Sequence, residues 1–216
     1  AQAAPPAATN DAILIYSGTT GYRHDSIPAG IKAVSELAAR RGLSVVASED
    51  PTVFSATSLE RFKAIVLLSC TTDPKKPESE WLVGDRRDAL QQFVRNGGGI
   101  VAIHAAADSH YHWPWYGRLI GAHFERHPAG TPKGRVTVVA PSDPVVQGLA
   151  RTTDRVDEWY YFADYDPVSK VLLTLDPASI GERDTNPNPV AWTRQINEGR
   201  IFYTAMGHTT ESYSEP

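Results

Sequence analysis

The sequence lacks the features that mark a disulfide scaffold, a membrane protein or a nucleic-acid-binding protein. Its 216 residues include one cysteine, Cys70, so neither an internal disulfide framework nor a cysteine-based zinc site can form. No apolar run approaches the ~20 residues that a membrane-spanning helix needs. The net charge of −4 offers no basic surface to nucleic acid or to an anionic membrane. The first loop, SGTTGYRH, lacks the GxGxxG spacing, which disfavours a tightly bound nicotinamide.

What the chain does contain is typical of one globular domain. Hydrophobic residues make up 41% and charged residues 21%, and the length suffices for one large α/β domain. We therefore expect a single domain over residues 11–216. The first ten residues, AQAAPPAATN, lack apolar periodicity and are interpreted as a disordered or processed tail. A tail left by signal-peptide removal predicts a periplasmic or secreted protein, whereas a linker remnant would leave a cytoplasmic location.

Apolar runs alternate with amphipathic stretches in the first half of the chain. One helix, with Pro28 in its first turn, is expected to stop at Gly42, and another over 87–95 to stop at the glycines 97–99. Strands that alternate with helices through right-handed crossovers predict a doubly wound, mostly parallel sheet. Buried strands are predicted at residues 12–16, 43–47, 64–68 and 100–103.

The second half of the chain holds short strand-like runs separated by turn residues. They predict added strands, some of them antiparallel at an edge of the sheet, rather than a second domain. No helix-forming stretch follows the last run, so we expect the chain to be truncated relative to the natural protein. The runs cover residues 135–140, 156–162, 171–175, 190–193 and 200–205.

Three of the seven histidines stand at the same place relative to predicted strands. His24 lies in the loop after the first strand, His104 ends the strand at 100–103, and His208 follows the last strand. Ligands bind beyond the carboxyl ends of parallel strands, so we expect these imidazoles to share a site. An imidazole there can act as base, acid or metal ligand. The alternative is a buried histidine that is satisfied by a backbone carbonyl.

Two carboxylates and several aromatic residues accompany these histidines. Asp108 is expected to orient His104 or to act as its carboxylate partner, and Glu158 is either a site acid or base or an ordinary surface residue. His110 is predicted to be a solvated loop residue, and Cys70 a small buried side chain without catalytic role. Aromatic faces suit sugar rings, although the same residues can form a lid core over the sheet edge. The cluster comprises Tyr111, Trp113, Trp115 and Tyr116.

A second arrangement of histidines raises the question of a metal. His123, Glu125 and His127 are spaced two apart, so on a strand they would share one face and suit zinc, which they would not do on a helix or loop. The pattern is not specific. We therefore expect no metal or other cofactor, with zinc as the alternative.

Several motifs together resemble the ThuA-like family, which is named for trehalose utilisation. The resemblance covers about residues 12–213. It implies a fold like that of class I glutamine amidotransferases, a flavodoxin-like three-layer α/β sandwich with a mostly parallel central sheet and added edge strands. The motifs are GYRHDSI, GGGIVAIHAAAD, WPWYGRLIGAHFERHP, DEWY and PVAWTRQINEGRIFYTAMGH.

The resemblance also implies a role in carbohydrate utilisation. Members are linked to disaccharide metabolism and are thought to act with sugar oxidoreductases on trehalose-like or 3-keto sugars. The catalytic positions that it implies are His24, His104, Asp108, Glu158 and His208. The substrate-binding positions are Tyr111, Trp113, Tyr116, His127 and Trp192.

One departure from the glutamine amidotransferases bears on the reaction. Those enzymes place a nucleophilic cysteine where this chain has His104, and a histidine cannot form the thioester that glutamine hydrolysis requires. The expected function is therefore histidine-based acid/base chemistry on a small sugar such as a 3-keto disaccharide derived from trehalose. A non-catalytic sugar-binding module and a zinc-dependent hydrolase are the alternatives. Expected partners are a small carbohydrate and a sugar oxidoreductase of the same pathway, with a homo-oligomer left open.

Overall fold

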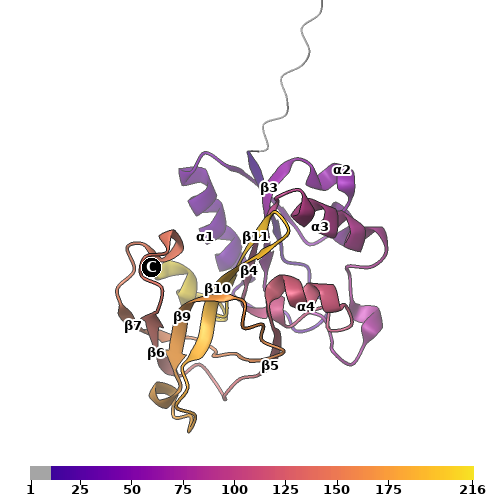
Figure 1. Cartoon of the computed structure of the whole chain (residues 1–216). Helices are drawn as coiled ribbons and strands as arrows, with labels where there is room; N and C mark the ends of the chain where they lie inside the picture. The colour runs from indigo at the N-terminus through magenta and orange to yellow at the C-terminus, as the bar shows by residue number, and fades with distance from the viewer. Residues whose placement is uncertain (1–10) are drawn as a thin grey trace, which may run out of the picture.

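The computed structural model describes residues 11–216, which form a nine-stranded mixed sheet and a two-stranded ribbon (Figure 1). The helices are α1 (Ile27–Arg40), α2 (Ala56–Leu59), α3 (Asp85–Arg95) and α4 (Pro114–Ile120). The strands are β1 (Ala12–Tyr16), β2 (Ser44–Ser48), β3 (Phe62–Leu68), β4 (Gly99–Ile103), β5 (His123–Arg126), β6 (Lys133–Val138), β7 (Thr152–Val156), β8 (Tyr161–Ala163), β9 (Lys170–Asp176), β10 (Asn188–Ile196) and β11 (Gly199–Thr204).

The large sheet has a parallel half and an antiparallel half. Its order is β2–β1–β3–β4–β11–β10–β9–β6–β7. The first five strands in this order pair in parallel, and the four pairings from β11 to β7 are antiparallel. The antiparallel ribbon pairs β5 with β8. The sheet is therefore not mostly parallel as expected, because the added antiparallel strands supply half of its pairings.

Helices cover both faces of the parallel half, as alternation along the strands requires. Ile13 and Ile15 of β1 pack on the side of α1, whereas Leu14 and Tyr16 face the larger core that includes residues of α2, α3 and α4. Figure 1 shows α1 on one side of the sheet and the other three helices on the opposite side. No helix within residues 11–216 is long and apolar enough to cross a membrane.

The predicted strands of the first half are confirmed, with ends that shift by at most two residues. The single run predicted over 156–162 is wrong. β7 ends at Val156 and β8 begins at Tyr161, so residues 157–160 form a loop between two different sheets. That loop turns inward: Asp157 and Glu158 are buried, and Asp157 accepts hydrogen bonds from the backbone that follows β11. The tail predicted over residues 1–10 lies outside the described residues.

The carboxyl ends of the five parallel strands lie at one edge of the sheet. The chain leaves β1 toward β2 on one side and leaves β3 toward β4 on the other, so the strand order reverses between β1 and β3. Crevices at such reversals are where open α/β sheets bind ligands. The loops after β1, β4 and β11 all open onto this edge.

Two glycines at the opposite edge give a matched test of the packing. A Cβ at Gly199 would lie 2.6 Å from Val94 Cγ1 and 2.8 Å from the Val94 carbonyl oxygen. The atom nearest to a Cβ at Gly99 would be Ala64 Cβ, at an ordinary contact distance of 3.5 Å. Both glycines begin neighbouring parallel strands. We predict that Gly199→Ala lowers the free energy of unfolding by about 1–3 kcal/mol, the cost of overpacking, and that Gly99→Ala lowers it much less. Urea unfolding of both variants checks this, and equal stabilities would contradict it.

Candidate functional site

His104 is held rigidly where β4 ends. Its backbone has φ of +50°, in the left-handed region that β-strand residues avoid, and its side chain is fully buried. The Nδ1 atom lies 2.6 Å from the carbonyl oxygen of Ala205, and the Tyr203 hydroxyl donates to the His104 carbonyl at 2.9 Å. A carbonyl can only accept, so Nδ1 carries a proton, and Nε2 presents a lone pair when the ring is neutral.

His24 and His208 bring two more imidazoles to the same point. The ring centroid of His104 lies 4.9 Å from that of His24 and 5.4 Å from that of His208, and the His24 and His208 centroids are 5.1 Å apart. His24 is buried and His208 is partly exposed. The three histidines predicted to share a site are thus brought together by the loops after β1, β4 and β11.

Glu158 closes this group with a carboxylate from the antiparallel half of the chain. Its Oε2 lies 3.4 Å from His104 Nε2 and 3.2 Å from His208 Nδ1. Neither approach has hydrogen-bond geometry. We call these four residues, His24, His104, Glu158 and His208, the histidine–glutamate centre; one ligand atom from each lies within 4.8 Å of the others.

The charges of the centre follow from its burial. Burial lowers the pKa of His24 to about 3, assisted by the neighbouring His104 and His208 rings, so His24 is neutral at pH 7. Burial raises the pKa of Glu158, but the facing His104 and His208 rings outweigh burial and hold that pKa well below its usual range. Glu158 in turn raises the pKa of His208. The centre therefore combines an ionised carboxylate with a neutral imidazole.

Asp157, which the sequence did not single out, positions one side of the centre. Its buried carboxylate accepts hydrogen bonds from the backbone N–H of Gly207 at 2.8 Å and of His208 at 3.0 Å, and from the Ser212 hydroxyl. Ser26 adds a hydrogen bond to the Gly207 carbonyl at 2.8 Å. The signal available in the sequence was the pair of adjacent carboxylates in DEWY, only one of which can point toward the histidines.

Tyr160 was also missed as a site residue. Its ring lies 4.2 Å from that of His104, centroid to centroid, tilted by 30°, and it is buried. Phe124 packs in turn against Tyr160, with the centroids of these two rings 4.3 Å apart. The aromatic stack fixes the plane of the His104 imidazole.

Three further predicted residues lie beside the centre or away from it. His127 Nδ1 lies 3.3 Å from Glu158 Oε1 and 2.8 Å from the carbonyl oxygen of Pro128. Asp108 accepts a hydrogen bond of 2.5 Å from the Tyr111 hydroxyl, and burial raises the pKa of its carboxyl. Asp108 therefore pairs with Tyr111, and no direct contact joins it to His104.

The aromatic residues predicted to wall the pocket are mostly buried in the core. Trp192 is fully buried and its Nε1–H donates to the Ile120 carbonyl at 2.8 Å. Tyr116 is fully buried with its hydroxyl bonded to the Ala106 carbonyl, and Trp113 stacks on Trp115. Both rings pack in the main hydrophobic core and their polar atoms are taken up by backbone carbonyls, so Trp192 and Tyr116 act as core residues.

The alternative of a zinc site formed by His123, Glu125 and His127 on one face of β5 does not fit the structure. His123 is buried and stacks on Tyr111 at 4.9 Å, Glu125 is exposed, and His127 turns toward Glu158. A register shift between Phe124 and Arg126 breaks the regular alternation that would put the three on one face. Within residues 11–216, the four ligand atoms that converge are those of the histidine–glutamate centre.

The prediction that His110 is solvated is wrong. Its ring is fully buried, 4.5 Å from Trp81 and 4.8 Å from Tyr116, centroid to centroid. Nearby, the buried carboxylate of Glu80 accepts hydrogen bonds from the His112 backbone N–H at 2.7 Å and from Arg87 Nη2 at 3.0 Å. This network fixes the loop that follows Asp108.

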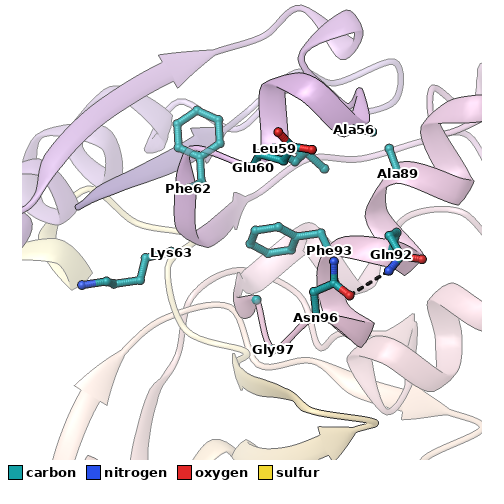
Figure 2. Close-up of a pocket in the computed structure, with 11 residues that line it drawn as sticks. Ala56, Leu59, Glu60, Phe62, Lys63, Ala89, Gln92, Phe93, Asn96 and Gly97 are labelled. Atoms are coloured by element: carbon teal, nitrogen blue, oxygen red, sulfur yellow. Dashed lines mark hydrogen bonds between the residues drawn. The ribbon is translucent and has the colours of Figure 1, made fainter. Parts of the chain in front are cut away.

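Two other candidate features lie apart from the centre. Cys70 is buried, and burial raises the pKa of its thiol to about 12, which disfavours a nucleophilic role. A hollow between α2 and α3 is lined by Phe62, Phe93 and Gln92 among others (Figure 2). It lies by the start of β3, at the edge of the sheet opposite the histidines, and Gln92 is hydrogen-bonded to Asn96 beside it.

The fold and the site define a mixed α/β protein whose polar centre lies at the carboxyl edge of its parallel strands. The sequence matches the ThuA family, described as trehalose utilisation, over residues 12–216, and the chain belongs to that family. The family suggested by the motifs is thereby confirmed. No curated protein matches the sequence.

Solved structures share the fold at low sequence identity. A putative ThuA-like protein from Bacteroides uniformis ATCC 8492 is 24% identical with a TM-score of 0.76, over 99% of this chain and 88% of its own. A second, from Parabacteroides merdae ATCC 43184, is 18% identical with a TM-score of 0.68, over 92% and 80%. The protein STM1381 from Salmonella typhimurium LT2, titled cytoplasmic, is 12% identical with a TM-score of 0.63, over 92% and 89%.

The Glu80 network predicts a specific dependence of stability on pH. Burial raises the pKa of Glu80, but His110 and the backbone N–H of His112 outweigh burial and lower that pKa to about 2. A carboxyl whose pKa is depressed in the folded state stabilises the fold above its unfolded pKa and loses that contribution as pH falls toward its folded pKa. The free energy of unfolding should therefore decline between about pH 5 and pH 2 in part through Glu80.

We predict that Glu80→Gln costs about 1–3 kcal/mol at pH 7, because the buried donors lose their charged acceptor, and costs less at pH 3. Urea unfolding at several pH values measures this, with Glu125→Gln on the surface as control. A Glu80→Gln deficit that is the same at pH 7 and pH 3 would be evidence against the assignment.

Proposed function

We propose that the protein is a carbohydrate-utilisation enzyme that acts on a small sugar, a 3-keto disaccharide such as a trehalose derivative. The observation that carries the proposal is the convergence of three imidazoles and one carboxylate at the ligand-binding edge of the sheet, in a chain that belongs to the trehalose-utilisation family. Among residues 11–216, the four ligand atoms that converge include one carboxylate, that of Glu158.

The class I glutamine amidotransferase-like, flavodoxin-like fold is part of this proposal. In its support, the parallel strands follow the order 2-1-3-4-5 when numbered along the chain, which is the flavodoxin-like order. The left-handed backbone of His104 also resembles the strained turn on which related α/β enzymes expose a nucleophile. With histidine at that turn, thioester chemistry is excluded and proton transfer remains.

A 3-keto sugar suits proton transfer by a weak base. Its C2 hydrogen is acidified by the C3 carbonyl. A base takes this proton, the electron pair forms a C1–C2 double bond, the glycosidic C1–O bond breaks, and the departing oxygen takes up a proton. Two residues near the centre can accept the proton, His104 through its free Nε2 and Asp108 through its carboxylate. A keto substrate requires prior oxidation, so a sugar oxidoreductase is the partner class that would supply it.

The first test is turnover of 3-keto-trehalose by the wild type, followed by His104→Ala and Asp108→Asn. General acid–base catalysis contributes typically 10²–10⁴-fold, so loss of the true base should lower kcat by at least about 100-fold. Released glucose, measured by a coupled assay, reports the reaction. The matched control is His112→Asn, which removes a histidine of the adjacent loop that lies outside the centre.

Two outcomes decide against an enzyme of this class. If His104→Ala and Asp108→Asn both turn over the keto sugar at the wild-type rate, the centre is not the reaction centre. If sugars raise the melting temperature of the wild type without any product, the protein is a sugar-binding module.

A further inference from the structure

We propose that the histidine–glutamate centre binds one divalent transition-metal ion, through the rings of His24, His104 and His208 and the carboxylate of Glu158. The inference deepens the proposed function because it concerns the same centre. Its evidence, however, is the bonding state of the four residues and does not depend on the identity of the sugar.

The ring nitrogens of the centre lack the partners that buried polar atoms require. His104 Nε2, His208 Nδ1 and His24 Nδ1 are buried, and each has no hydrogen-bond partner within residues 11–216. A buried polar atom without a partner costs about 1–3 kcal/mol. Three such nitrogens at one place indicate a missing group that accepts electron pairs, which a cation provides.

The Glu158 carboxylate is placed as a fourth ligand. A zinc ion bound at about 2.0–2.1 Å to four tetrahedral ligands separates neighbouring ligand atoms by roughly 3.3 Å. Glu158 Oε2 lies 3.4 Å from His104 Nε2 and 3.2 Å from His208 Nδ1, so two edges of the tetrahedron already have this length. The widest separation, within 4.8 Å, would close by up to roughly 1.5 Å through movement of the rings carried on loops.

The surroundings of His104 are those of a metal ligand. Imidazoles that bind a metal donate their other N–H to a carboxylate or a backbone carbonyl, which fixes the tautomer. His104 does this through Nδ1 and the Ala205 carbonyl at 2.6 Å. The Asp157 carboxylate accepts a hydrogen bond from the His208 backbone N–H, so the backbone of this second proposed ligand is also fixed.

The donor set selects the kind of metal. Imidazoles suit zinc, iron, nickel and copper, whereas calcium and magnesium prefer oxygen ligands. Imidazoles bind a metal as neutral ligands, so together with the Glu158 carboxylate the set would carry a single negative charge that a divalent cation compensates. When the metal is bound, the free electron pair of His104 Nε2 is engaged, and Asp108 is the remaining proton acceptor of the two named above.

The experiment measures metal binding without substrate. The purified full chain is analysed for metal by mass spectrometry, stripped with dipicolinate, and titrated with Zn²⁺ by calorimetry and with Co²⁺ by visible absorption. We expect about one ion per chain and the intense visible band of four-coordinate Co²⁺. Glu158→Gln and His208→Ala should weaken Zn²⁺ binding by more than the roughly 100-fold that loss of an outer partner can cost.

Controls separate a lost ligand from a lost fold. Near-ultraviolet circular dichroism verifies the fold of each variant, and His112→Asn should bind Zn²⁺ as the wild type does. The inference is overturned if the stripped wild type binds neither ion, or if both ligand variants bind Zn²⁺ as tightly as the wild type.

The same proteins distinguish this inference from the proposed function. Stoichiometric metal with no turnover of keto sugars would support the metal site and overturn the proposed function. Full turnover by a stripped protein that binds neither Zn²⁺ nor Co²⁺ would overturn the metal site and leave the proposed function standing.

Discussion

The hydrogen bond from His104 Nδ1 to the Ala205 carbonyl is the interaction on which the centre depends. It exists because β4 and β11 are parallel neighbours whose last residues, Ile103 and Thr204, are in register, so the next residue of each strand lies side by side. The bond fixes one tautomer and points Nε2 toward the remaining three residues of the centre. A flipped ring or a slipped register would present an N–H to His24 and His208 in place of an electron pair.

The centre also joins the two halves of the sheet. The parallel half delivers three histidines, because loops that follow parallel strands meet at one edge. The carboxylate comes from the antiparallel half, through the loop that connects β7 at the far edge of the sheet to β8 in the separate ribbon. The antiparallel strands are therefore more than an extension of the sheet, since without them the histidines would have no acidic partner.

How much of this could be predicted from the sequence depends on how local each feature is. Buried parallel strands appear as apolar runs, so β1, β3 and β4 were found, and His24, His104 and His208 follow from their places after strands. The sequence does not decide whether Glu158 is a site residue or a surface residue, because its loop is defined by pairings between distant segments. His110 was predicted wrongly because its burial arises from Trp81 and Tyr116, which no local pattern connects to it.

Asp157 and Glu158 are adjacent in sequence but differ in their contacts, since Asp157 binds backbone groups and Glu158 faces imidazoles. Asp157 accepts hydrogen bonds from three backbone N–H groups, those of Glu158, Gly207 and His208, and from the Ser212 hydroxyl, so its charge is occupied in holding these two turns. Glu158, next in sequence, approaches only the rings of His104, His127 and His208, at 3.2–3.4 Å. The His104 and His208 rings favour the ionised form of this carboxylate. Its neighbour Asp157 supplies the structural contacts, so the Glu158 carboxylate is left facing the imidazoles, as the proposed site requires.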